Sequence, residues 1–367
     1  MKKTETKYRF LFAGGGTGGH LFPAVAVAEK IKMLKPEAEI LFVGTKAKIE
    51  SQVVPKLGYN FKTIWIKGVA RRMDLQNLLF PVKLVVSLFQ SLWISIRFKP
   101  RVAIGSGGYV SGPAVWGASV MGAKVIILEQ NSYPGITTRL LEKKASQVHL
   151  SFEDSKKYLK DKRKLFVTGN PVRSSLSLEE KSKALKKFNL SESKKTVLVL
   201  GGSLGARTVN EAVAKSIPAL MENGIQVIWQ TGKNYYETYR NLESAQVWIN
   251  PFIEDMGAAF SACDLLISRA GATTIAEITM LGIPTIFVPS PNVAANHQYL
   301  NAKSLSDKDA AILVADSKAS MELEGMVLGV IFDRPRLEEL SRNIKLFAKP
   351  EAALTVAQNA IKLAESL

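Results

Sequence analysis

The chain has 367 residues, of which 47% are hydrophobic and 22% are charged. This composition is typical of globular proteins and excludes disordered or collagen-like chains, and the length favours two domains. One cysteine and three histidines exclude a disulfide framework and disfavour a zinc site. Our expectation for the whole chain is that it carries no cofactor. The formal charge of +17 favours phosphates, polyanions or anionic lipid as partners.

Short apolar runs alternate with helical patterns along the chain, and we expect each run to form a strand. The runs lie at 8–13, 40–44, 102–104, 125–129, 165–168, 196–200, 227–231, 265–268 and 285–288. They are continuous rather than alternating, which indicates strands covered on both faces. Strands and helices in this order predict an α/β protein with parallel sheets, whose ligands bind at the carboxyl ends of the strands.

The two halves of the chain resemble each other. FLFAGGGTGG at 10–19 matches VLVLGGSLGA at 197–206, and both predict a strand, a glycine turn and a helix. We therefore predict two Rossmann-like doubly wound domains, at 1–170 and 171–346, that face each other across a cleft. The final helical stretch, about 347–367, could pack back on the first domain or on the second, and the sequence does not decide between them.

One apolar segment has the character of a surface helix. Residues 75–96 carry apolar side chains at helical spacing and are flanked by arginines and lysines. The pattern is typical of a core helix and also of a helix that lies on a membrane. Its longest uncharged part, 84–96, is shorter than the roughly 18 residues that a membrane span needs, so we expect no span.

The glycines at 14–19 follow the first strand and satisfy G-x-G-x-x-G. A helix that begins there can hold a phosphate through its N–H groups and its dipole, although a tight turn without a ligand is the alternative. A dinucleotide oxidoreductase is disfavoured, because the second strand ends in FVGTK at 42–46, without an acid for a ribose diol. His20 lies at the helix start, where burial would keep it neutral and suit it to act as a base.

Two segments of the second half repeat this arrangement. Residues 201–207, GGSLGAR, offer backbone donors, a hydroxyl and a cation after a strand. In 268–277, SRAGATTIAE, the turn could bind a phosphate, and Glu277 could accept hydrogen bonds from a ribose diol or simply be a surface glutamate. Facing turns suggest two diphosphate ligands, or one ligand bridged between the domains. A nucleic-acid-binding module would explain the charge, but no recognised nucleic-acid motif supports it.

Together the motifs resemble one family of enzymes. The matching segments are GGGTGGH at 14–20, GSGGYVSGP at 105–113, EQN at 129–131, GNPVR at 169–173, GGSLGAR at 201–207 and the segment 268–277. The chain is similar nearly end to end to the UDP-N-acetylglucosamine–N-acetylmuramyl-(pentapeptide) pyrophosphoryl-undecaprenol N-acetylglucosamine transferases, the MurG family. Another transferase of the same fold should not share all of these motifs.

The resemblance implies a GT-B glycosyltransferase fold and an inverting hexosyltransferase. Such an enzyme moves GlcNAc from UDP-GlcNAc to lipid I, the undecaprenyl-diphosphate-linked MurNAc-pentapeptide. The product is lipid II, with a beta-1,4 linkage, for peptidoglycan and hence for cell-wall biogenesis, cell shape and division. It also implies a peripheral protein on the cytoplasmic face of the bacterial cell membrane, with UDP-GlcNAc, lipid I, the anionic membrane surface and other cell-wall synthesis and division proteins as partners, and with no nucleic acid.

The resemblance further implies roles for individual residues. The residues expected to bind UDP-GlcNAc are Thr17, Gly18, Gly19, His20, Asn131, Arg173, Ser203, Ile253, Ala272, Thr273, Thr274, Glu277 and Gln298. Those expected to face the acceptor diphosphate are Gly15, Gly16, Gly107, Gly108 and Tyr109. Those expected to contact the membrane are Leu75, Leu78, Leu79 and Phe80.

One position departs from the family pattern. Members often carry histidine immediately before the EQN, where this chain has Leu128. His20 and Glu129 are therefore the candidates for the general base, and the residues alone do not choose between them. Helix N-termini together with Arg173 could stabilise the leaving diphosphate, so the reaction is expected to need no metal.

Overall fold

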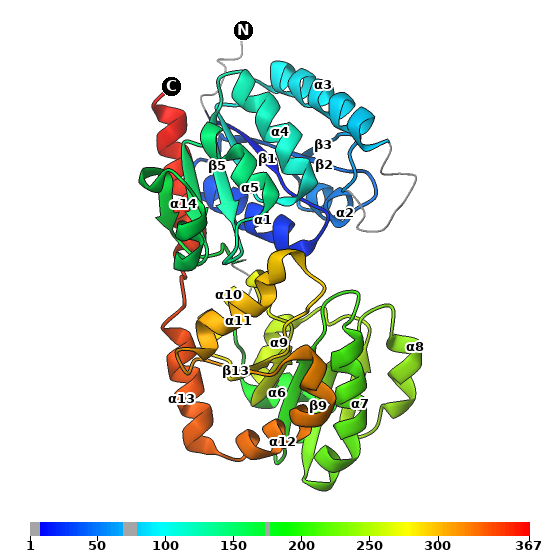
Figure 1. The fold of residues 1–367 in the computed structure, drawn as a ribbon. Helices are drawn as coiled ribbons and strands as arrows, with labels where there is room; N and C mark the ends of the chain where they lie inside the picture. The colour runs from blue at the N-terminus through cyan, green and yellow to red at the C-terminus, as the bar shows by residue number, and fades with distance from the viewer. Residues whose placement is uncertain (1–7, 69–78, 173–176) are drawn as a thin grey trace. The chain divides into compact units, whose positions relative to one another are not determined.

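The computed structural model describes residues 8–68, 79–172 and 177–367. The chain divides into two compact units. Unit 1 comprises Met1–Arg173 and Lys349–Leu367, and unit 2 comprises Ser174–Ala348. The last helix therefore belongs to the same unit as the first strand, and Figure 1 shows it in red beside the blue and green elements of unit 1.

The described part of unit 1 contains a seven-stranded parallel sheet in the order β3-β2-β1-β4-β5-β6-β7. Its strands are β1 (Arg9–Ala13), β2 (Glu39–Gly44), β3 (Asn60–Thr63), β4 (Val102–Gly105), β5 (Lys124–Glu129), β6 (Gln147–Leu150) and β7 (Leu165–Val167). Its helices are α1 (Gly18–Leu34), α2 (Ile49–Lys56), α3 (Phe80–Phe98), α4 (Gly108–Val120), α5 (Ile136–Leu141) and α14 (Ala352–Glu365). The strand order reverses between β1 and β4, as in doubly wound folds.

Helices cover both faces of this sheet because alternate strand residues point to opposite sides. Phe10 and Phe12 of β1 pack in a core with α1 and α14. Leu11 and Ala13 of the same strand pack in a second core with α4 and α5. The hydroxyl of Tyr8 donates a hydrogen bond of 2.6 Å to the Glu365 carboxylate, which fixes the end of α14 against unit 1.

The described part of unit 2 repeats the design with six parallel strands in the order β10-β9-β8-β11-β12-β13. Its strands are β8 (Lys195–Leu200), β9 (Ile225–Gln230), β10 (Val247–Asn250), β11 (Leu265–Ser268), β12 (Thr285–Phe287) and β13 (Ile312–Leu313). Its helices are α6 (Lys181–Lys187), α7 (Arg207–Glu222), α8 (Tyr236–Tyr239), α9 (Met256–Ala262), α10 (Ala272–Leu281), α11 (His297–Ser306), α12 (Ala319–Ile331) and α13 (Arg334–Lys345). Here the order reverses between β8 and β11.

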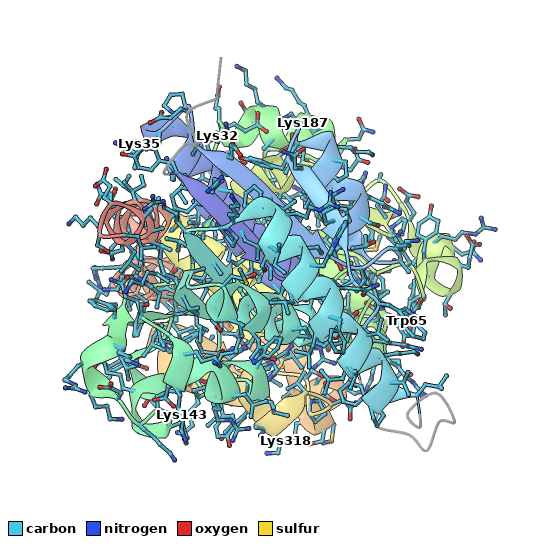
Figure 2. All side chains as sticks on the ribbon, turned by 90° about the horizontal axis from the view of Figure 1, so that it is seen from above. Lys32, Lys35, Trp65, Lys143, Lys187 and Lys318 are labelled. Atoms are coloured by element: carbon cyan, nitrogen blue, oxygen red, sulfur yellow. The ribbon has the colours of Figure 1, made fainter. Side chains whose placement is uncertain are left out.

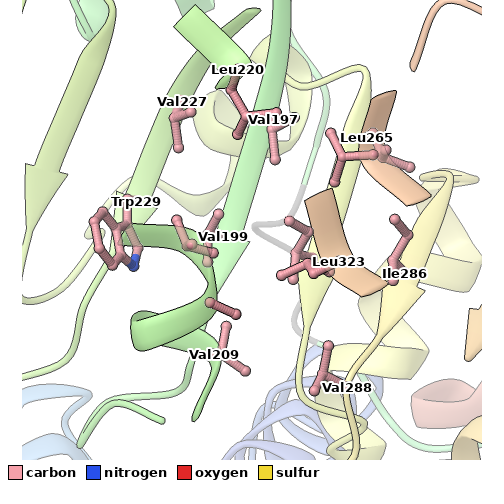
Figure 3. Packing of buried hydrophobic residues seen from close by; sticks show 14 of the residues in the cluster. Val197, Val199, Val209, Leu220, Val227, Trp229, Leu265, Ile286, Val288 and Leu323 are labelled. Carbon is pink, nitrogen blue, oxygen red and sulfur yellow. The ribbon is translucent and has the colours of Figure 1, made fainter. Parts of the chain in front are cut away.

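The core of unit 2 joins its sheet to the helices on one face. Val197, Val199 and Trp229 from the strands belong to the same core cluster as Leu323 of α12 (Figure 3). Trp229 also needs a polar partner, and its indole N–H donates to the Asn210 side chain at 3.0 Å. This bond ties α7 to β9 beside the carboxyl end of the sheet.

All nine predicted strands are present, and the α/β class with two doubly wound sheets is confirmed. The structure adds β3, β6, β10 and β13, which the sequence did not predict. These four strands are two to four residues long. Short strands with polar residues, such as His149 in β6, lack the continuous apolar run by which the other strands were predicted.

The helix α3 carries its apolar side chains on the outside. Its large exposed residues are Val82, Val85, Phe89, Trp93 and Ile96. The residues that it buries are instead mostly small and polar, namely Ser87, Ser91, Ser95 and Ile94. The serines allow close packing, because a Cβ on Gly117 of α4 would lie 2.8 Å from the Ser91 backbone. The apolar stripe of this helix is therefore not core.

By length and composition alone, α3 could also cross a membrane, and among the described residues it is the one helix for which this holds. We expected no membrane span because the longest uncharged part of this segment is short. The whole helix, with Lys83 and Arg97 included, is nevertheless long and apolar enough to span a membrane. The core helix of a soluble protein passes the same test. Its packing on α4 shows how it is held in unit 1.

Candidate functional site

The predicted site segments lie at the two points where the strand order reverses. In unit 1 the first glycine turn (14–19) follows β1 and the second glycine turn (105–108) follows the neighbouring β4. In unit 2 the third glycine turn (201–205) follows β8, and the segment 268–277 follows the neighbouring β11. Ligands of doubly wound folds bind at these reversal points, outside the carboxyl ends of the strands.

The two glycine turns of unit 1 pack directly against each other. Gly107 and Gly108 have φ of +96° and +77°, which favour glycine. A Cβ on Gly107 would lie 2.6 Å from Nδ1 of His20, and a Cβ on Gly108 would lie 2.7 Å from the carbonyl oxygen of Gly15. Any side chain at these positions would push the turns apart, so the glycines hold His20 against the second turn.

A buried carboxylate that the sequence did not predict holds the first glycine turn. Glu50 of α2 is only 1% exposed. The N–H of Gly16 donates to its Oε2 at 3.0 Å, while the N–H and the hydroxyl of Thr45 donate to its Oε1 at 3.1 and 2.9 Å. This internal anion occupies a backbone donor that was expected to face the acceptor diphosphate.

Tyr109 lies over the same turn. Its ring would be 3.5 Å from a Cβ on Gly16. Burial raises the pKa of the Tyr109 hydroxyl, and the nearby Glu50 carboxylate raises it further. The phenol therefore stays protonated at neutral pH and can donate a hydrogen bond.

Glu129, one of the two base candidates, is bound within its own loop. Its Oε1 accepts from the N–H of Asn131 at 3.0 Å. Its Oε2 accepts from the N–H of Gly135 at 2.9 Å and from the hydroxyl of Thr138 at 2.6 Å. The carboxylate is 3% exposed, and this burial raises its pKa. These hydrogen bonds hold the loop at residues 129–138 in one conformation and thereby position Asn131.

His20, the other candidate, is partly exposed at the beginning of α1. Its backbone carbonyl accepts a hydrogen bond of 2.6 Å from the hydroxyl of Ser106 in the second glycine turn. Thr17 and Gly19, which precede it, are exposed. The first turn thus presents His20 and Thr17 at the carboxyl end of β1.

In unit 2 the third glycine turn is fixed by the neighbouring loop. Gly202 and Gly205 have φ of +89° and +86°. The N–H of Gly205 donates to the carbonyl of Gly202 at 3.0 Å, and a Cβ on Gly205 would lie 2.2 Å from the carbonyl oxygen of Thr231. Ser203 at the tip is exposed, so its hydroxyl is accessible to a ligand.

The segment after β11 begins α10 with Gly271 as its N-cap, and no side chain of the described residues caps the helix there. Its dipole and first-turn N–H groups suit a phosphate. Arg269 ties the turn to its surroundings, because it donates to the Val288 carbonyl at 2.8 Å and pairs with Asp316. Glu277, further along α10, is 8% exposed.

Two other predicted donor contacts are already engaged within unit 2. The N–H of Ile253 donates to the Gln230 side chain at 2.9 Å, so this N–H is already used within unit 2. Oε1 of Gln298 accepts from the N–H of Ser290 at 2.9 Å, so the amide oxygen is already used within unit 2. Gln230 was not predicted, although a glutamine that ends a buried strand is an unusual residue at that position.

The structure therefore groups the predicted residues by unit. Unit 1 brings together both glycine turns, Tyr109 and His20, with Glu129 and Asn131 on the adjacent strand end. Unit 2 holds Ser203, Ile253, Gln298, Glu277 and the turn at 272–274 on neighbouring strand ends. Arg173, Leu75 and Leu78 lie outside the described residues. Among residues 8–68, 79–172 and 177–367, no three His, Cys, Asp or Glu side chains cluster as metal ligands.

Exposed apolar side chains continue beyond the described residues that were expected to contact the membrane, Leu79 and Phe80. Leu79 is 49% exposed, and the outer face of α3 continues it with Phe89 at 70% and Trp93 at 55%. Figure 2 labels Trp65, which lies beside α3 and whose backbone N–H donates to Oε1 of Gln90 at 2.7 Å. Lys83 lies over the Trp65 ring and Arg97 over the Trp93 ring, so cations border the apolar face.

Two doubly wound units, each with a glycine turn at its reversal point, are the architecture of the GT-B fold, and the family models place the chain among the glycosyltransferases of this fold. Two family models match the chain, namely the glycosyltransferase family 28 N-terminal domain over residues 10–150 and the family 28 C-terminal domain over residues 196–356. The crystal structure of MurG from Acinetobacter baumannii has a TM-score of 0.75 and 27% sequence identity, covering 96% of this chain and 99% of that one.

Curated relatives agree with the family models. A protein of Flavobacterium psychrophilum is 44% identical over 98% of this chain and 99% of its own length. One of Bacteroides thetaiotaomicron is 45% identical over 99% of each chain. Both are called UDP-N-acetylglucosamine–N-acetylmuramyl-(pentapeptide) pyrophosphoryl-undecaprenol N-acetylglucosamine transferase. This chain belongs to that family, MurG.

Proposed function

We propose that the protein transfers N-acetylglucosamine from UDP-GlcNAc to lipid I and so forms lipid II for peptidoglycan. The observation that carries the proposal is the identity of 44% with a named transferase over 98% of the chain. The geometry supports it, because both reversal points carry glycine turns at strand ends, as two diphosphate-bearing substrates require.

Unit 2 is the proposed donor site. The uncapped start of α10, at 272–274, would hold the donor diphosphate together with Ser203. Arg173, which the resemblance also assigns to this diphosphate, lies outside the described residues. Glu277 would accept hydrogen bonds from the ribose diol, and the carbonyl of Ile253 would recognise the uracil. The amide of Gln298 would contact the sugar, oriented by the bond that its oxygen already accepts. A diphosphate held by N–H dipoles is stabilised as it departs, which lowers the barrier to transfer.

Unit 1 is proposed to bind the acceptor and to supply the base. Transfer with inversion needs the acceptor hydroxyl to lose its proton as UDP departs. His20 suits this role, because the residue is partly exposed and its ring packs against Gly107. Both oxygens of Glu129 accept hydrogen bonds within its loop, so we assign Glu129 to the placement of Asn131 rather than to proton transfer.

The proposed location is the cytoplasmic face of the cell membrane, with unit 1 lying on the lipid through α3. The outer face of this helix is apolar and is bordered by Lys83 and Arg97. Apolar side chains would enter the interface while the cations meet anionic headgroups. A lipid-linked acceptor is confined to that surface, so docking there would bring enzyme and substrate together.

The test is transfer of labelled GlcNAc from UDP-GlcNAc to a lipid I analogue, with a chelator present and with UDP-glucose as the control donor. We expect chelator-resistant transfer from UDP-GlcNAc alone. If UDP-GlcNAc protected the protein against thermal unfolding but no transfer occurred, the donor assignment would stand and the acceptor assignment would be wrong.

A further inference from the structure

Gln130 has a buried amide whose nitrogen lacks a partner. The side chain is 3% exposed, and its Nε2 has no hydrogen-bond partner in the described parts of the chain. A buried donor left without an acceptor costs about 1–3 kcal/mol. Native proteins seldom carry such a group unless a ligand or an ordered water meets it. None of the roles assigned above uses Gln130.

The amide lies in the corner where the second glycine turn meets His20. Gln130 directly follows β5, which pairs with β4, the strand that leads into this turn. Its Oε1 would lie 3.4 Å from a Cβ on Gly107, and the same Cβ would lie 2.6 Å from Nδ1 of His20. The amide of Gln130 and the ring of His20 therefore flank the same glycine.

The two glycine turns of unit 1 differ in what they can offer an anion. The first turn already gives the N–H of Gly16 to the Glu50 carboxylate, whose negative charge opposes a second anion. The second turn begins the 13-residue helix α4, and no side chain of the described residues caps that helix at Gly107. Positive φ at Gly107 and Gly108 gives this turn a glycine conformation in which no Cβ lies between the backbone and an anion.

We propose that Gln130 is a substrate-binding residue, whose amide nitrogen donates a hydrogen bond to a phosphate oxygen of the acceptor at the second glycine turn. This inference rests on the proposed function and refines it. The acceptor diphosphate binds to the turn at 105–108 and to Gln130, beside His20, while the first turn is a support held by Glu50. A neutral amide adds a donor without adding charge in a buried corner.

The kinetic test uses Gln130→Met, which keeps the volume and removes the donor, and Gln130→Glu, which places a carboxylate there. Gln358→Met, on the exposed face of α14, is the matched control. We expect the KM for the lipid I analogue to rise about tenfold in Gln130→Met and about a hundredfold in Gln130→Glu, as loss of a charge-assisted bond predicts. The KM for UDP-GlcNAc should stay within about twofold of wild type, a split that a general loss of structure would not produce.

A second measurement does not depend on transfer or on folding of a variant. In wild-type protein labelled with ¹⁵N-glutamine, the side-chain signal of Gln130 is assigned by its loss in Gln130→Met and followed during addition of inorganic pyrophosphate. We expect this signal to shift with pyrophosphate and to stay in place with UDP, which controls for occupancy of unit 2.

The outcomes separate the inference from the proposed function. If the amide signal shifts but the protein transfers nothing to lipid I, the phosphate site at Gln130 stands and the assignment of lipid I as the acceptor is wrong. Normal transfer by the wild type, with an unshifted signal and an unchanged acceptor KM in Gln130→Met, refutes the inference alone and assigns the amide to a buried water.

Discussion

Replacement of Glu50 by glutamine should disturb the first glycine turn without touching a substrate. The carboxylate accepts three hydrogen bonds, from the N–H of Gly16 and from the N–H and hydroxyl of Thr45. Glutamine has nearly the same shape, but its N–H₂ group must face one of these donors. Each hydrogen bond to a charged group contributes about 1.5–3 kcal/mol, so we expect Glu50→Gln to lower the free energy of unfolding by about 2–4 kcal/mol.

For a domain of this size the loss corresponds to a fall in Tm of roughly 5 to 15 °C. The assay is thermal unfolding followed by steady-state transfer at a temperature where the variant is folded. Because His20 follows the turn directly, kcat should fall at least about tenfold while the KM for UDP-GlcNAc is unchanged. Glu37→Gln, at an exposed acid of unit 1, is the control and should change Tm by less than about 1 °C.

The result that would refute this reasoning is a Glu50→Gln protein that melts within about 1 °C of wild type and retains its kcat within twofold. The carboxylate would then not be what holds the turn. If the variant lost stability but not kcat, Glu50 would stabilise the turn without positioning His20.

Three further predictions concern the donor site, the membrane surface and a buried histidine. Glu277→Ala should raise the KM for UDP-GlcNAc at least about tenfold and leave the acceptor KM unchanged; an unaltered donor KM would remove Glu277 from the ribose site. Phe89→Glu should weaken sedimentation with phosphatidylglycerol vesicles several-fold, whereas Leu346→Glu, at a similarly exposed position of unit 2, should not; equal losses would argue against docking through α3. Burial lowers the pKa of His149 from 6.5 to about 4, so the neutral form contributes stability above pH 6.5 that is lost as pH falls toward 4, by up to about 3 kcal/mol. In urea unfolding His149→Phe should escape this loss, and a difference from wild type that is constant from pH 7 to 4 would contradict it.

The elements that could be predicted are those whose signal is local. The strand at 196–200 and the glycine turn after it follow from a continuous apolar run that ends in two glycines. The start of α10 follows from small residues after the next strand. Glu50 could not be found this way, because it lies 34 residues after Gly16 and only the pairing of β1 with β2 brings the two together.

In the helix α3, too, one feature could be predicted from the sequence and another is decided by packing. Its periodicity in sequence predicted a helix with an apolar stripe, but it did not say which side faces the sheet. Packing against Gly117 of α4 selects the serines for the inner face, because only small side chains fit that approach. The large apolar residues are left outside by that choice.

The sequence by itself determined the class, the two doubly wound units, the family and the segments that carry the chemistry, because these depend on short runs of neighbouring residues. Only the tertiary structure decided what each polar side chain does. It bound Glu129 and Glu50 into hydrogen bonds within unit 1, and it left the amide nitrogen of Gln130 beside His20 without a partner in the described residues. The physical reason is that a buried polar group takes its role from the donors and acceptors that folding brings to it, and these come from distant strands.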